Sequence, residues 1–149
     1  MIRPTALLLA AMLTVAAHAA YDEKADAKAD VRQALTSAKA EKKPMLIIFG
    51  ANWCKDCMAL DQALTTPANA AVMREFKVVK VDVGDFDRNL DVVNAYGNPI
   101  KKGIPAAVVV NAADGRVLYA TQGGELANAR KMSDSGVQDF FKDVLAKAK

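Results

Sequence analysis

Residues 45–57 read MLIIFGANWCKDC, an unbroken apolar run followed by a turn and a pair of cysteines. The run at 45–49 contains no polar residue, which is typical of a strand buried on both faces of a sheet. The apolar positions after the turn recur with helical spacing at Cys57, Leu60 and Leu64. This spacing predicts a helix that opens at about Cys54 and ends before Thr65. The sequence therefore places both cysteines at a junction between a strand and a helix.

Hydrophobic periodicity predicts alternating helices and strands on both sides of this junction. The expected elements are helices at 23–41, 54–64, 67–76 and 87–96, strands at 45–49 and 77–83, a hairpin at 106–121 and a C-terminal helix. Ser135 and Gln138 match a capping box for the last of these helices. Such an order favours an α/β fold in which a central mixed sheet is flanked by helices on both faces.

The composition is that of an ordinary globular domain. The chain has 149 residues, of which 52% are apolar and 25% charged. A chain of this size can bury a normal core without disulfide staples or a structural metal. The formal net charge of +3 includes no basic run, so no nucleic-acid partner is expected.

The N-terminal residues are typical of an export signal. Arg3 provides a positive charge, residues 6–16 are apolar but too short to span a membrane, and Ala17-His18-Ala19 matches a cleavage pattern. We expect residues 1–19 to be a signal peptide and 20–149 to be a single mature domain without a membrane anchor. Its expected location is the bacterial periplasm or the outside of the cell, where disulfides are permitted.

Removal of this segment would leave no histidine, because His18 is the only one in the sequence. Ser-His-Asp and Cys-His mechanisms need an imidazole base, and a zinc site needs more ligands than two cysteines supply. The chemistry that remains is thiol-disulfide exchange at Cys54 and Cys57, with no cofactor and no metal.

Two motifs resemble the thioredoxin-fold family: Trp-Cys-Lys-Asp-Cys at 53–57, and Gly-Ile-Pro at 103–105 before the hairpin. The resemblance covers about residues 40–149. It implies that Pro105 follows a cis peptide bond and faces the cysteines, and that Ile104 contacts the substrate. The buried acid that thioredoxins carry six residues before the first cysteine is absent here.

The residue at the position of that acid is Ile48. The resemblance also implies a substrate contact for Trp53, although packing of its ring over the disulfide is an equal expectation.

The two cysteines are expected to play different roles. Cys54 lies at the helix N-terminus, where unpaired amides and the macrodipole favour its thiolate, the attacking form. Lys55 should lower the pKa of Cys54, and Asp56 should oppose that effect. Cys57 lies one turn further in, on the apolar face of the helix. We expect it to be buried and to resolve the mixed disulfide.

Asp61 follows Cys57 by four residues on the same helical face. An acid in this part of the helix moves protons in some periplasmic thioredoxin-like reductases, so the resemblance implies proton transfer for Asp61. We favour a solvated carboxylate instead, because buried aspartates are rare. A solvated pair is likewise favoured for Lys101 and Lys102.

These features predict an exported thioredoxin-like thiol-disulfide oxidoreductase that acts on protein thiols and disulfides or on small thiols. The direction favoured is reduction, because the sequence shows no inserted helical domain or dimerisation segment. Three alternatives stay open: an inert local disulfide, copper(I) binding by the two thiolates, and a binding or chaperone module without turnover.

Overall fold

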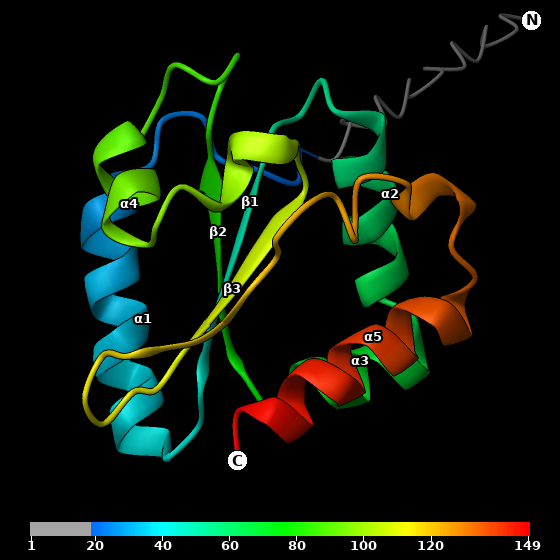
Figure 1. Ribbon diagram of the computed structural model, residues 1–149. Coiled ribbons are helices and arrows are strands. Elements are labelled where there is room, and N and C mark those ends of the chain that lie inside the picture. Colours follow the sequence, from blue (N-terminus) through cyan, green and yellow to red (C-terminus); the bar gives the residue numbers. More distant parts are fainter. Residues whose placement is uncertain (1–18) are drawn as a thin grey trace, which may run out of the picture.

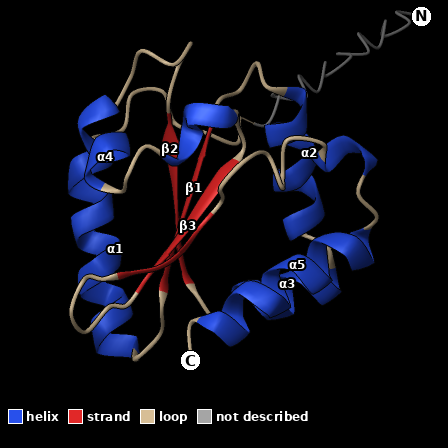
Figure 2. Cartoon of the chain, viewed as in Figure 1, coloured by secondary structure: helices blue, strands red, loops and turns tan. Residues whose placement is uncertain are grey.

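The computed structural model describes residues 19–149 and shows a four-stranded mixed sheet in the order β2-β1-β3-β4 (Figures 1 and 2). Strand β1 (Met45–Gly50) pairs in parallel with β2 (Lys77–Asp82) and antiparallel with β3 (Ala106–Val110). Strand β4 (Val117–Ala120) extends β3 as an antiparallel hairpin. The predicted α/β fold with a central mixed sheet is confirmed.

Helices cover both faces of the sheet (Figure 1). One face packs against α1 (Ala27–Glu41) and α4 (Leu90–Ala95). The other face packs against α2 (Lys55–Leu64), α3 (Pro67–Met73) and α5 (Asp134–Lys147). The sheet therefore separates two apolar cores.

Strand β1 supplies side chains to both cores. Met45, Ile47 and Phe49 belong to the core under α1 and α4, whereas Leu46 and Ile48 belong to the core under α2, α3 and α5. Because successive strand residues point to opposite faces, a strand covered on both faces needs an apolar residue at every position. This explains the unbroken apolar run.

Two helices begin later than their periodicity predicts. The helix expected at 23–41 begins at Ala27, because the Asp26 side chain caps it by accepting the amide of Ala29 at 3.0 Å. The helix expected at 87–96 begins only at Leu90. The residue before Leu90, Asn89, has a φ of 52°, a left-handed conformation that a right-handed helix cannot contain.

The predicted cap of the last helix is wrong. The Ser133 hydroxyl, rather than that of Ser135, accepts the amide of Gly136 at 3.0 Å, so α5 begins at Asp134. Gln138 instead donates from its side chain to the carbonyl of Ala68 on α3.

Two short 3-10 helices, η1 (Pro99–Lys102) and η2 (Ala129–Lys131), lie in segments that have no clear periodicity. Within residues 19–149, no helix is long and apolar enough to cross a membrane. The predicted signal peptide falls outside the described residues except for Ala19.

Tyr21 anchors the segment before α1 into the core. Its side chain is 2% exposed. The Asn52 side chain accepts a hydrogen bond from the Tyr21 backbone amide at 3.0 Å and donates one to the Tyr21 carbonyl at 2.8 Å. A Cβ atom at Gly50 would collide with the Tyr21 ring and hydroxyl, so the end of β1 needs a glycine to admit this side chain.

Candidate active site

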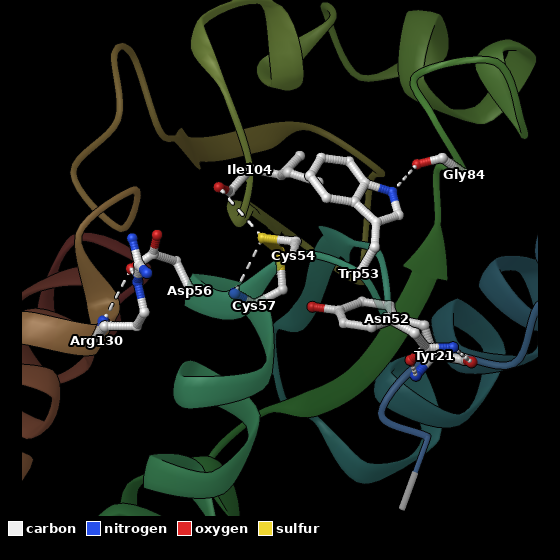
Figure 3. The surroundings of a disulfide bond; sticks show 9 residues. All are labelled: Tyr21, Asn52, Trp53, Cys54, Asp56, Cys57, Gly84, Ile104 and Arg130. Carbon is white, nitrogen blue, oxygen red and sulfur yellow. Dashed lines mark hydrogen bonds and ion pairs between the residues drawn. A yellow bond between two sulfur atoms is a disulfide. The ribbon is translucent and has the colours of Figure 1, made fainter.

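The two cysteines form a disulfide at the start of α2, with Cα atoms 5.2 Å apart (Figure 3). Cys54 is the N-cap residue, and its sulfur accepts the backbone amide of Cys57 at 3.1 Å. The prediction that this helix opens at about Cys54 is confirmed, since α2 begins at Lys55 and Cys54 caps it. Because an amide points at the Cys54 sulfur, the site favours negative charge on that atom in the reduced state.

The two sulfur-bearing residues differ in exposure. Cys57 is fully buried, as expected, whereas Cys54 is 6% exposed. Cys54 is therefore less exposed than we expected of a residue at the start of a helix. It is still more accessible than Cys57. Attack by or on an outside sulfur is easier at Cys54.

The loop before β3 lies against the disulfide. The Ile104–Pro105 peptide bond is cis, as the resemblance implied. The Ile104 carbonyl oxygen lies 3.8 Å from the Cys54 sulfur. The disulfide carries no proton, so this is a contact rather than a hydrogen bond. It places the backbone of this loop beside the more accessible cysteine.

Trp53 lies next to Cys54 with its ring 55% exposed. Its indole nitrogen donates to the Gly84 carbonyl at 2.9 Å, which fixes the ring against the loop between β2 and α4. The ring centroid of Phe86 in that loop is 6.1 Å from that of Trp53. The side chain of Trp53 is thus held in place and still open to a partner.

Asp56, between the cysteines, is paired with Arg130. Both the backbone amide and the Nε atom of Arg130 donate to the Asp56 carboxylate, at 3.0 and 3.2 Å. The sequence predicted that Asp56 would disfavour the Cys54 thiolate, and the guanidinium charge offsets that effect. Arg130 could not be identified from the sequence, because it lies 74 residues away in a segment without periodicity.

Asp61 is buried, at 6% exposure, so the expectation of a solvated carboxylate is wrong. It forms an ion pair with Lys80 of β2. In the parallel register Lys80 lies beside Ile48, the position where thioredoxins carry their buried acid. The carboxylate of Asp61 on α2 is therefore linked through Lys80 to the strand position beside Ile48.

The Tyr21 hydroxyl points toward the cysteine pair (Figure 3). Burial, together with the negative charges of Asp61 and Asp82, raises the pKa of Tyr21, so its hydroxyl is neutral at physiological pH. Burial also raises the pKa of Asp82, against hydrogen bonding from the Gly84 amide and the charge of Arg88. Hydrophobic periodicity does not identify Tyr21 or Asp82, whereas Asp61 was identified by its spacing from Cys57.

Two comparisons with known proteins identify the family of this chain. A family model described as thioredoxin-like matches residues 26–112. A crystal structure of a disulphide isomerase from Xylella fastidiosa Temecula1 is 58% identical, with a TM-score of 0.81, and the match covers 83% of this chain and 95% of that chain. The chain belongs to the thioredoxin-like family.

More distant thioredoxin-like structures share the fold. The oxidised C-terminal domain of DsbD from Neisseria meningitidis is 22% identical over 80% of this chain and 96% of that chain, with a TM-score of 0.58. A thioredoxin from Thermus thermophilus is 18% identical over 78% of this chain and 85% of that chain, with a TM-score of 0.59. None of the curated proteins matches the chain.

The described part of this thioredoxin-like chain holds no group of three or more histidine, cysteine or acidic side chains that could bind a metal ion. The copper(I) alternative would use Cys54 and Cys57 alone, and only after reduction of their disulfide. Met58 packs against the core that contains both cysteines, as a core-filling methionine does.

The position of Asp61 leads to a testable prediction. Asp61 lies one helical turn beyond Cys57, and we expect its carboxylate to accept the proton that the Cys57 thiol loses when it attacks. We expect Asp61→Asn to slow the resolution of a mixed disulfide by about a hundredfold, the lower end of what a positioned general base contributes. The measurement is the resolution rate as a function of pH, followed by stopped-flow.

Asp143→Asn, at an exposed position of α5, is the matched control and should leave the pH profile unchanged. A profile for Asp61→Asn that coincides with that of the wild type would assign Asp61 a structural role only.

Proposed function

We propose that this protein catalyses thiol-disulfide exchange through Cys54, in the direction of substrate reduction. The observation that carries the proposal is the environment of the Cys54 sulfur. This sulfur accepts the amide of Cys57 at 3.1 Å and contacts the carbonyl of Ile104 at 3.8 Å. The first contact favours a thiolate, and the second places that thiolate beside a backbone edge.

The proposed reaction begins at Cys54, because this cysteine is more exposed than Cys57. The Cys54 thiolate attacks one sulfur of the partner's disulfide, the partner's S–S bond breaks, and the other partner sulfur leaves as a thiolate. Cys57 then loses its proton and attacks the Cys54 sulfur, which releases the second partner thiol. The product is the Cys54–Cys57 disulfide. Two electrons pass to the partner, which is reduced.

The proposed substrate-binding residues are Trp53, Ile104 and Pro105. An extended partner segment can pair with the backbone edge beside the cis proline as an added strand. The exposed indole of Trp53 is next to Cys54 in the chain and offers an apolar surface. The proposed partners are proteins with an accessible disulfide, or small thiols.

Two activities are candidates: reduction of a partner's disulfide, and isomerisation of a partner's disulfides. In the reductive direction, Asp61 is the proposed proton acceptor for the attacking Cys57, one helical turn away. The Xylella fastidiosa relative is described as a disulphide isomerase, which favours isomerisation. The deciding quantity is the equilibrium between this protein and glutathione.

A reductase should have a reduction potential close to the roughly −270 mV of thioredoxin, and an isomerase a value near the roughly −180 mV of protein disulfide isomerase. A value near the roughly −120 mV of a strong oxidant would overturn both assignments. Absence of catalysed reduction of a model disulfide would favour the binding or chaperone module instead.

We also propose that the protein is exported to the periplasm or secreted, and that the mature chain begins at Ala20. The Ala17-His18-Ala19 pattern supports this cleavage site. The intact mass of protein recovered from the periplasmic fraction should correspond to residues 20–149. Recovery of the full-length mass, or of cytosolic protein alone, would contradict the proposal.

A further inference from the structure

Large apolar side chains gather beside the disulfide. Among residues 19–149, four large apolar side chains are exposed, and three of them form what we call the apolar patch: Trp53, Phe86 and Leu90, at 55%, 43% and 41% exposure. Trp53 contacts Phe86, and Phe86 and Leu90 line the same groove. The fourth, Val117, lies on β4.

Phe86 of this patch has a backbone conformation that phenylalanine rarely adopts. Its φ is 64°, a conformation that bulky residues adopt rarely because Cβ crowds the backbone. The loop around it is closed by the amides of Asp87 and Arg88, which both donate to the Val83 carbonyl, at 3.1 and 3.2 Å. Since the ring is 43% exposed, burial in the core does not explain why a phenylalanine occupies a position that suits glycine.

The groove that Phe86 and Leu90 line also touches the loop before the cis proline. It has a volume of about 390 Å³ and its apolar lining includes Phe86, Leu90 and Ile100. Gly103 also lines the groove, and it is the neighbour of Ile104, whose carbonyl contacts the Cys54 sulfur. The groove is therefore continuous with the edge at which we propose that substrates pair.

The shape and charge of the groove indicate its occupant. In an extended segment, side chains two residues apart point to the same face about 7 Å from each other. A segment whose cysteine reacts with Cys54 can therefore place a neighbouring side chain in the groove. Lys101 is the charged residue among those that line it, which makes an acidic neighbour more favourable than a basic one.

We propose that the apolar patch and its groove select the disulfide partner. The partner is an extended protein segment that carries a large apolar side chain two residues from its cysteine, with an acidic residue nearby. Phe86 is the specificity-determining residue, kept at a strained backbone position because its ring contacts the partner. This inference rests on the proposed function, since it names the substrate class of the same site.

The test compares two peptides, each linked through its cysteine to glutathione. The peptides are identical, including one glutamate, except that the position two residues from the cysteine is phenylalanine in one and serine in the other. Cys54 attacks the peptide sulfur and releases glutathione as a thiolate. Cys57 then displaces the peptide as a thiol, and the Cys54–Cys57 disulfide closes. The rate of peptide release is measured with reduced protein in excess.

The wild type should release the phenylalanine peptide about tenfold faster, the ratio expected for partial burial of one large apolar side chain. Phe86→Gly should bring the ratio of the two rates close to one while the melting temperature stays equal or rises, because glycine adopts this φ without strain. Val117→Ser, the matched exposed control on β4, should keep the wild-type ratio.

Leu90→Ser tests the groove independently of the strained position and should also lower the ratio. Equal rates for the two peptides with the wild type, or an undiminished ratio in both Phe86→Gly and Leu90→Ser, would overturn the inference and leave the proposed function standing. Release of neither peptide would instead count against the proposed function. A wild-type dimer that Phe86→Gly converts to a monomer would assign the patch to a second copy of the chain and overturn the partner class.

Discussion

Cys57→Ser should accumulate a mixed disulfide between Cys54 and its protein partners, whereas Cys54→Ser should form little adduct and have no turnover. The reason is the different placement of the two sulfurs. Cys54 is the more accessible, and its sulfur faces the amide of Cys57, so it makes the first bond to the partner. Cys57 is fully buried and can reach only the Cys54 sulfur. Without it, nothing inside the protein displaces the bound partner.

The measurement is trapping of adducts from a periplasmic extract, together with alkylation of the reduced protein as a function of pH. Cys54 should titrate below the roughly 8.5 of a free thiol. The double substitution of both cysteines by serine is the control for adducts that do not involve the motif. Equal trapping by both single variants would indicate an inert local disulfide or a binding module, and would contradict the catalytic assignment.

Tyr21→Ala should lower the free energy of unfolding of the oxidised protein by about 3 kcal/mol or more, as truncation of large buried aromatic side chains does. The Tyr21 side chain is 2% exposed and packs at the end of β1, where Gly50 leaves room for it. Tyr21→Phe keeps the ring and should change the free energy of unfolding by less than about 1 kcal/mol. Urea denaturation measures both values.

Gly50→Ala provides an internal check on this prediction. A methyl group at that position collides with the Tyr21 ring, so it should destabilise the wild type. In the Tyr21→Ala background the ring is gone, and the same substitution should have much less effect. The two changes should therefore couple strongly in a double-mutant cycle. Additive effects, or a Tyr21→Ala loss below about 1 kcal/mol, would show that Tyr21 does not dock at Gly50 in solution.

The parts of the fold that follow local rules could be predicted from the sequence. The apolar run of β1 and the spacing of Cys57, Leu60 and Leu64 each follow from how a single element is buried. Hydrophobic periodicity in the sequence predicts such burial directly. The cis bond before Pro105 came from family resemblance. Helix ends were less predictable, because Ser133 and Ser135 are both good caps and only packing decides between them.

The parts of the site that depend on contacts between distant elements could not be predicted. Whether Asp61 is solvated or buried depends on Lys80, which lies on strand β2, 19 residues later in the sequence. Arg130 of the 3-10 helix η2 reaches Asp56 across 74 residues, and Asn52 binds the backbone of Tyr21 across 31 residues. Local patterns describe the environment of an element on average, whereas these pairs depend on how elements meet in three dimensions.

The docking of Tyr21 also determines how the protein should be handled as a reagent. The N-terminal segment packs against the strand end that leads into the cysteines, whereas α5 ends at the opposite end of the sheet (Figure 1). A fluorophore, affinity tag or surface tether placed at Ala20 would therefore perturb the chemistry that it is meant to report. The same attachment through the exposed Lys149 would leave the redox centre free for immobilised capture of its partners.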